Sequence, residues 1–434
     1  MESYFDNMLE KQLIDDRRDF HKYAEVKWTE FRTSSVVAKR LMDLGYDVKL
    51  GLDICVKGVQ FGYPDEEYMK FQEERAITQG ADSELVKQMA GLPGVVGILD
   101  TGKKGPVTAF RFDMDALNNQ EILESGHYPY EEGFASINEG FCHACGHDGH
   151  TSIGLGVAQV LMKMKDKLTG KIKLIFQPAE EGGGGAIGMV KKGILDDVEY
   201  FFAIHVGLTK LDGLPLKSHG IICGVNDFLD NRRIDVSYIG KAAHPCGDPH
   251  VGKNALLAAC AATLNIHSIA PHSEGMLRIN VGKLEGGVSR NTIAPTANFQ
   301  LECRGENQIV ADYGEDKVMA IIKGAASMYQ VESHIDIVGC TPSATSDEKA
   351  IEMVYSVAQD VDWFKEYHRI GSVGGSDDAS DMIRQVQKNG GIGTYIGLGA
   401  DFASGFHHSA FDFDENVMLP SVELLVKLVE KLQK

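Results

Sequence analysis

The ten residues from Phe141 to His150, FCHACGHDGH, concentrate side chains that bind metals or carry redox chemistry. Cys145 and His147 are separated by one glycine, and thiolate and imidazole are both good ligands for Zn²⁺, Mn²⁺ and similar ions. Cys142 and Cys145 also form a C-x-x-C pair, so a dithiol redox protein is a competing hypothesis. A structural zinc site would need a second such pair, and the sequence holds none.

A second candidate segment is QPAEEGGGGA, in which Glu180 and Glu181 close an apolar run and precede four glycines. In a metal-assisted hydrolase, one carboxylate can ligate the metal while its neighbour acts as general base toward a water molecule. Taken alone, the pair is equally typical of a solvated acidic turn. A phosphate-binding loop is disfavoured, because the lysine and the Ser or Thr that should follow the glycines are missing.

Single histidines and aspartates supply further candidates. His205 closes the apolar run YFFAIHV, and His407 and His408 lie in the loop GFHHSAFDFDEN. Asp113 and Asp115, in RFDMDAL, are candidates for metal ligands or for orienting a histidine ligand. Each is weak evidence alone, but together four segments offer five ligands, which suits two cations about 3.5–4 Å apart.

The elements around these residues indicate an α/β fold with a mostly parallel central sheet. The runs PVTAFRF, KIKLIFQP, YFFAIHV and GTYIGLG are short, apolar and bounded by glycine, proline or charge, as buried parallel strands are. Helical periodicity runs from Ile153 to Leu168 and from Val422 to Leu432. Because ligands collect beyond the carboxyl ends of strands in such sheets, the candidate residues are expected to meet there.

The middle of the chain has a different pattern, with less buried strands and two helix-like stretches. It predicts an inserted α+β domain with a four-stranded sheet and two helices at residues 227–339. The catalytic domain is then expected to comprise residues 1–226 and 340–434.

Composition limits the function classes. The formal net charge of −19 makes nucleic acid and anionic membranes poor partners, and anionic small substrates would need a locally placed cation. Eight cysteines without a framework spacing and the lack of a signal-like start favour a cytoplasmic protein.

The motifs CGHDGHT, PAEEGGGGA, AIHVGL, GKAAHP, GVSRNTIAP, GGSDDASDM and FHHSAFDFDE resemble the M20 metallopeptidase clan, and within it the amidohydrolase branch with a cysteine metal ligand. They follow the family's order over nearly the whole chain. A finer resemblance, to hydrolases of N-aroyl glutamates, rests on RRDFHKYAEVKWTEFRTS and GLPGVVGILDTGKKGP.

The resemblance implies a dinuclear catalytic domain, an inserted dimerisation or lid domain and a homodimer, with Mn or Zn as the two divalent metal ions. Its implied metal ligands are Cys145, His147, Glu181, His205 and His407, the last preferred to His408. It makes Glu180 the general base and Asp115 an orienting residue. In the inserted domain, His244 would polarise the scissile carbonyl across a dimer, and Arg290 and Asn291 would hold the substrate's carboxylate end.

The function that follows is hydrolysis of the amide bond of an N-acyl amino acid, with p-aminobenzoyl-glutamate, which yields p-aminobenzoate and glutamate, as the leading substrate. Three alternatives stay open. They are an aminoacylase or dipeptidase with another acyl group, a non-catalytic or shared subunit that acts with a related second chain, and the dithiol redox protein.

Overall fold

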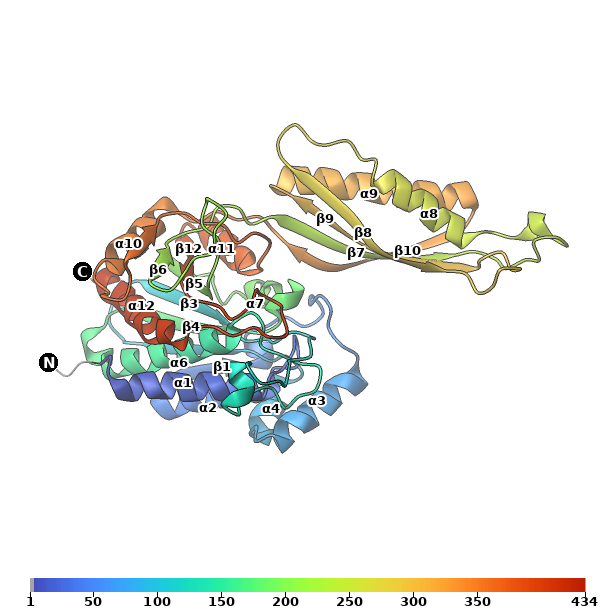
Figure 1. Cartoon of the computed structure of the whole chain (residues 1–434). Helices are drawn as coiled ribbons and strands as arrows, with labels where there is room; N and C mark the ends of the chain where they lie inside the picture. Colours follow the sequence, from blue (N-terminus) through green and yellow to red (C-terminus); the bar gives the residue numbers. More distant parts are fainter. Residues whose placement is uncertain (1–3, 434) are drawn as a thin grey trace. The chain divides into compact units, whose positions relative to one another are not determined.

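The computed structural model describes residues 4–433 and divides the chain into two compact units. The main unit comprises the residues up to Asp227 together with those from Ala344 onward, and the inserted unit is Phe228–Ser343. In the main unit, eight strands form one sheet in the order β1-β2-β4-β3-β5-β12-β6-β11 (Figure 1). The four adjacent strands β4, β3, β5 and β12 are parallel, which confirms the predicted α/β class.

The bounds of these strands are β1 Asp47–Leu50, β2 Val95–Asp100, β3 Val107–Asp113, β4 Lys171–Gln177, β5 Tyr200–Val206, β6 Gly220–Ile222, β11 Glu366–His368 and β12 Ile392–Leu398. The α-helices of the main unit are α1 Asn7–Lys22, α2 Phe31–Leu44, α3 Glu66–Thr78, α4 Ser83–Met89, α5 Tyr128–Glu131, α6 His147–Lys163, α7 Gly185–Lys192, α10 Glu348–Ala358, α11 Ala379–Lys388 and α12 Met418–Leu432. Helices α6 and α12 cover one face of the sheet, and α7 and α11 cover the other (Figure 1).

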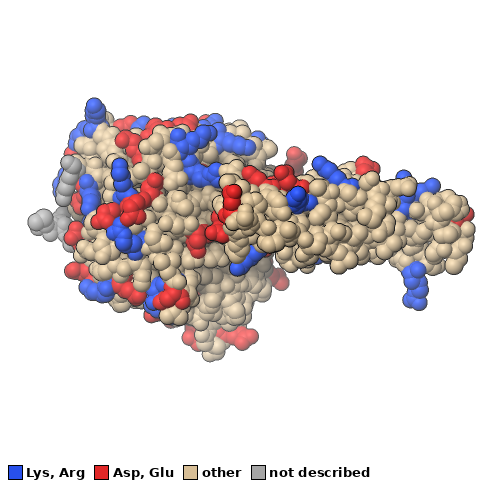
Figure 2. Space-filling view, turned by 90° about the horizontal axis from the view of Figure 1, so that it is seen from above, with Lys and Arg blue, Asp and Glu red and all other residues tan. Residues whose placement is uncertain are grey.

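The surface of the chain carries both signs of charge. On the face that Figure 2 shows, acidic and basic side chains are interspersed, so the excess negative charge is not gathered there in one field. Across residues 4–433, no helix is both long enough and apolar enough to cross a membrane.

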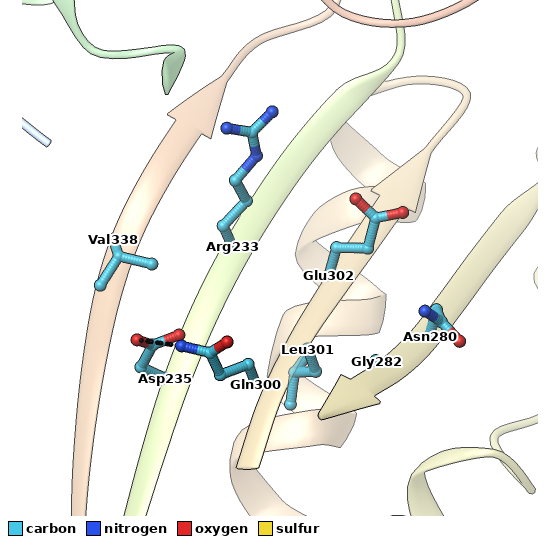
Figure 3. Close-up of a pocket in the computed structure, with 8 residues that line it drawn as sticks. All are labelled: Arg233, Asp235, Asn280, Gly282, Gln300, Leu301, Glu302 and Val338. Atoms are coloured by element: carbon cyan, nitrogen blue, oxygen red, sulfur yellow. Dashed lines mark hydrogen bonds between the residues drawn. The ribbon is translucent and has the colours of Figure 1, made fainter. Parts of the chain in front are cut away.

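The inserted unit is a four-stranded antiparallel sheet, ordered β10-β7-β9-β8, with two helices packed on it. Its elements are β7 Asp230–Ile239, α8 Ala255–Ile266, β8 Leu277–Gly286, β9 Thr296–Gly305, α9 Gln308–Tyr329 and β10 Glu332–Thr341. Polar side chains line a pocket on this sheet, where Gln300 donates a 3.0 Å hydrogen bond to Asp235 (Figure 3). None of the predicted site residues lines that pocket.

The end of the inserted unit differs from the prediction. The expected boundary between residues 339 and 340 falls inside β10, and the unit continues to Ser343. The reason is a register irregularity between Ile337 and Gly339, which interrupts the alternating pattern while pairing with β7 continues to Thr341.

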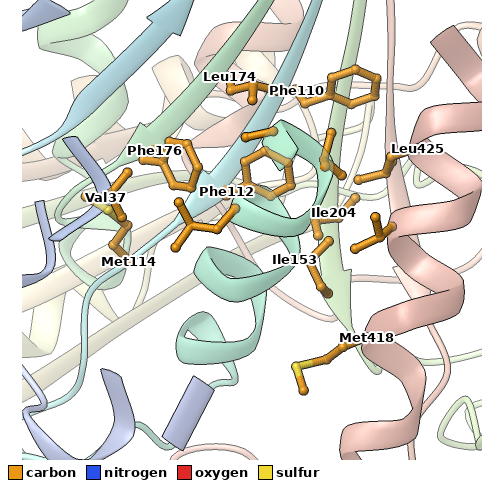
Figure 4. Packing of buried hydrophobic residues seen from close by; sticks show 14 of the residues in the cluster. Val37, Phe110, Phe112, Met114, Ile153, Leu174, Phe176, Ile204, Met418 and Leu425 are labelled. Atoms are coloured by element: carbon orange, nitrogen blue, oxygen red, sulfur yellow. The ribbon is translucent and has the colours of Figure 1, made fainter. Parts of the chain in front are cut away.

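Aromatic and aliphatic side chains of the sheet hold α6 in place. Phe112 on β3 and Phe176 on β4 stack with ring centroids 5.3 Å apart, and Ile153 of α6 belongs to the same buried cluster (Figure 4). Met418 and Leu425 of α12 complete this layer. Because α6 begins at His147, its packing fixes where the motif CGH meets the strand ends.

Candidate metal centre

The turn from Cys145 to His147 is shaped by its central glycine. Gly146 precedes the first residue of α6 with φ +89°, a left-handed conformation that glycine adopts without a steric cost. A Cβ at this position would also lie 2.4 Å from Cγ2 of Val206, beside His205 at the end of β5. The turn can therefore press against β5 only because residue 146 has no side chain.

The five predicted ligands come together at the carboxyl ends of the parallel strands. Three overlapping groups each have their ligand atoms within 4.8 Å of one another: Cys145 with His147 and His205, Cys145 with Glu181 and His407, and His147 with Glu180 and Glu181. Within these groups, Cys145 Sγ is 3.5 Å from Nε2 of His205, and His407 Nε2 is 3.5 Å from Oε1 of Glu181.

The structure separates His407 from its neighbour. His407 has φ +61°, its N–H donates to the carbonyl of Ala144 at 2.8 Å, and its ring reaches the cluster. In His408, Nδ1 instead accepts a hydrogen bond from the N–H of Ala410. A backbone tie to the CGH turn therefore selects which of the two rings faces the other ligands.

Hydrogen bonds at Nδ1 leave Nε2 of two histidines available as ligands. His147 Nδ1 lies 2.8 Å from the carbonyl of Asp115, and His205 Nδ1 lies 2.8 Å from the carbonyl of Val206, so both Nδ1 atoms donate. His150 has no such atom to offer, because Nε2 accepts from the N–H of Val206 and Nδ1 contacts the carboxylate of Asp113. The third histidine of the motif is therefore a structural residue.

The electrostatics fit a cation. Burial raises the pKa of the Cys145 thiol well above its ordinary value, and burial raises the pKa of Glu181 to about 7. Nε2 of His147 and Oε1 of Glu181 are buried without a hydrogen-bond partner within residues 4–433. Buried anionic donors and unpaired ligand atoms are costly unless a positive ion offsets them, so this donor set suits divalent metal.

Asp115 positions the two adjacent glutamates. Its carboxylate accepts from the N–H of Glu180 at 3.0 Å and from the N–H of Glu181 at 2.9 Å. Both glutamates lie in one short 3₁₀ turn, Glu180–Gly182, immediately beyond β4. Asp115 also lies 3.4 Å from Nδ1 of His147, so one side chain links β3, the glutamate turn and α6.

Sequence reasoning missed a buried charge network behind the glutamate turn. Arg111 has no exposed surface and contacts Asp113, Asp377 and Asp378. The carboxylates of Asp377 and Asp378 lie within 4.8 Å of Glu180, and Tyr395 donates to Asp377. A signal was present, because an arginine inside the apolar run PVTAFRF needs buried carboxylate partners.

The other predicted residues lie in the inserted unit. His244 Nδ1 accepts from the N–H groups of Cys246 and Gly247, which orients the ring at the start of its loop. The loop that holds Arg290 and Asn291 packs beside it, since the N–H of Ile293 donates to the carbonyl of Ala243 at 3.0 Å. The inserted unit thus gathers these three residues at adjoining loops.

An α/β unit whose parallel strands end at a cluster of cysteine, histidine and carboxylate ligands defines a metal-dependent hydrolase. Similar proteins span nearly the whole chain. It is 42% identical to one of the subunits of p-aminobenzoyl-glutamate hydrolase from Escherichia coli (strain K12), over 98% of this chain and 96% of the relative. It is 43% identical to indole-3-acetyl-aspartic acid hydrolase of Enterobacter agglomerans, over 94% and 93%.

Among solved structures, the aminobenzoyl-glutamate utilization protein from Klebsiella pneumoniae superposes with a TM-score of 0.82 at 37% identity, covering 97% of this chain and 96% of that chain. The model of peptidase family M20/M25/M40 matches residues 109–431. The chain belongs to this family.

The two cysteines of the C-x-x-C pair should respond differently to removal of the thiol. Cys145→Ala is expected to lose bound metal and amide hydrolysis, whereas Cys142→Ala should retain both, because Cys142 is buried outside the ligand groups and its backbone pairs with Leu117. Element analysis and activity of the two purified variants provide the check. Loss of function in Cys142→Ala, with Cys145→Ala active, would instead favour the dithiol redox protein.

Proposed function

We propose that this chain is a metal-dependent amidohydrolase that cleaves N-acyl amino acids into a carboxylic acid and a free amino acid. The observation that supports it most is the convergence of ligand-type side chains from four separated segments around Glu180. The proposed ligands are Cys145, His147, Glu181, His205 and His407. When bound, two Mn or Zn ions would make a water molecule acidic at neutral pH and polarise the amide carbonyl.

Glu180 is the general base of the proposal. Its carboxylate accepts a proton from the attacking water and then delivers that proton to the nitrogen of the leaving amine. Asp115 holds the backbone of Glu180 and Glu181, which keeps the base and its neighbouring ligand in fixed register. Such preorganisation matters because a base acts only within hydrogen-bond reach of the proton that it removes.

The inserted unit supplies substrate contacts in the proposal. His244 donates a hydrogen bond to the oxygen of the scissile carbonyl as negative charge develops there, and Arg290 and Asn291 bind the carboxylate of the amino acid. We further propose a homodimer in which His244 acts on the partner's active site. Because the Escherichia coli relative is named as one component of a hydrolase with several, a related second chain is also worth testing as partner.

The names of two relatives narrow the substrate. One acts on p-aminobenzoyl-glutamate and the other on indole-3-acetyl-aspartic acid, and each of these compounds joins an aromatic acyl group to an acidic amino acid. We therefore propose an N-acylated glutamate or aspartate with an aromatic acyl group, with p-aminobenzoyl-glutamate as the first candidate. An aminoacylase or dipeptidase with another acyl group is the second candidate.

Chelation tests the function directly. Purified protein treated with a chelator is expected to stop releasing p-aminobenzoate from p-aminobenzoyl-glutamate, and addition of Mn²⁺ or Zn²⁺ should restore the release. Chromatography of the products measures both steps. If the metal-loaded chain hydrolyses no N-acyl amino acid alone but does so with a related second chain, the shared-subunit hypothesis replaces this one. Full activity in metal-free protein would contradict the metal requirement.

A further inference from the structure

Lys27 places a positive charge against the glutamate turn. It lies between α1 and α2 and is half-buried. Its Cδ and Nζ stand 3.0 and 3.1 Å from the point that a Cβ on Gly182 would occupy, and Nζ stands 3.2 Å from the corresponding point on Gly62. Gly182 follows Glu181 directly, so the ammonium group lies beside the turn that carries the proposed general base.

The backbone around Lys27 is fastened on both sides. Before it, the carbonyl of Glu25 accepts from the N–H of Ala116, next to Asp115. After it, Trp28 is fully buried and donates from Nε1 to the carbonyl of Phe61 at 2.9 Å. Glu30 then accepts from the N–H of Ala179, which leads into the glutamate turn. The position of Lys27 is therefore built into the site, unlike that of a surface lysine on a mobile loop.

The charge balance of the site gives this lysine a task. The chain carries a formal net charge of −19, and Glu180, Glu181 and Asp115 crowd the same turn. An N-acylated glutamate or aspartate brings two more carboxylates. Arg111 cannot serve them, because its buried guanidinium is committed to Asp113, Asp377 and Asp378.

We infer that Lys27 is a specificity-determining residue whose ammonium group binds the side-chain carboxylate of an acidic amino acid in the substrate. This inference rests on the proposed function and deepens it. Every N-acyl amino acid has the α-carboxylate that Arg290 and Asn291 would bind, whereas only glutamate and aspartate need a second cation. Gly182 belongs to the same device, since any side chain there would push against Lys27.

A paired-substrate assay on the metal-loaded protein tests it. With N-(4-aminobenzoyl)-glutamate, Lys27→Met should raise KM roughly 10- to 100-fold, the usual worth of a hydrogen bond to a charged group, with little change in kcat. With N-(4-aminobenzoyl)-glutamine, which lacks the second carboxylate, KM should hardly change. Lys27→Arg should recover part of the loss, and Gly182→Ala should show a weaker form of the same substrate-dependent effect.

The controls separate the possible failures. Lys22→Met, which removes a half-buried lysine at the end of α1, should behave as wild type. Metal content measured on every variant shows whether the ligands are intact. An equal loss on both substrates in Lys27→Met, or no loss on either, overturns the assignment and leaves the proposed function standing. A wild-type protein that hydrolyses neither amide overturns the proposed function itself, and the assignment with it.

Discussion

Glu180→Gln is expected to lower kcat for amide hydrolysis by about 10²–10⁴-fold, the usual contribution of a general base. Glutamine keeps the size of the side chain but cannot accept the proton of the attacking water. The backbone N–H of residue 180 still reaches Asp115, so the turn should keep its shape. Because Glu180 is not among the five proposed ligands, bound metal should stay at the wild-type level.

Burial also suits Glu180 to the second half of its task. Burial, together with the charges of Asp377 and Glu181, raises the pKa of Glu180 well above its ordinary value. A carboxyl group that holds its proton firmly can keep it until the leaving amine accepts it.

Steady-state kinetics and element analysis of the same preparation check the Glu180 prediction. Glu84→Gln, which changes an exposed glutamate on α4 in the same way, serves as the matched control and should keep full activity. Turnover close to that of the wild type in Glu180→Gln would exclude this residue as the base. Loss of metal in that variant would show that Glu180 is a ligand.

Arg111→Met is expected to destabilise the main unit by about 3–5 kcal/mol, the usual effect of removing one partner from a buried ion pair. Burial alone would lower the pKa of Arg111, but the charges of Asp113, Asp377 and Asp378 outweigh it and raise that pKa well above its ordinary value. Without the guanidinium, these three buried carboxylates lose their common counter-charge, and Gln177 loses the donor at Nε of Arg111.

Denaturant unfolding followed by tryptophan fluorescence or circular dichroism measures this change. Arg369→Met is the matched control, because Arg369 also contacts two carboxylates, those of Glu348 and Glu352, but on the surface. It should unfold at the wild-type midpoint, since solvent screens exposed ion pairs. Equal midpoints for the two variants would mean that the buried network contributes no more than a surface one.

The sequence was sufficient for the parts of the protein that depend on short stretches of chain. Apolar runs bounded by glycine or charge predicted β3, β4, β5 and β12, because buried parallel strands need apolar side chains on both faces. The spacing of Cys145 and His147 around one glycine is likewise local, and the structure places both side chains in the same ligand groups. The family followed from motifs that each lie within a dozen residues.

The tertiary structure decided what depends on residues far apart in the chain. It chose His407 over His408 through a hydrogen bond to Ala144, and it showed that His150 is held by Asp113 and Val206. Arg111 meets Asp377 across 266 positions of sequence. Local patterns report only the conformation of a segment, whereas these pairings depend on strand order and on how the helices pack against the sheet. A buried arginine could be noticed in the sequence, but its partners, and the lysine beside the glutamate turn, were set by the fold.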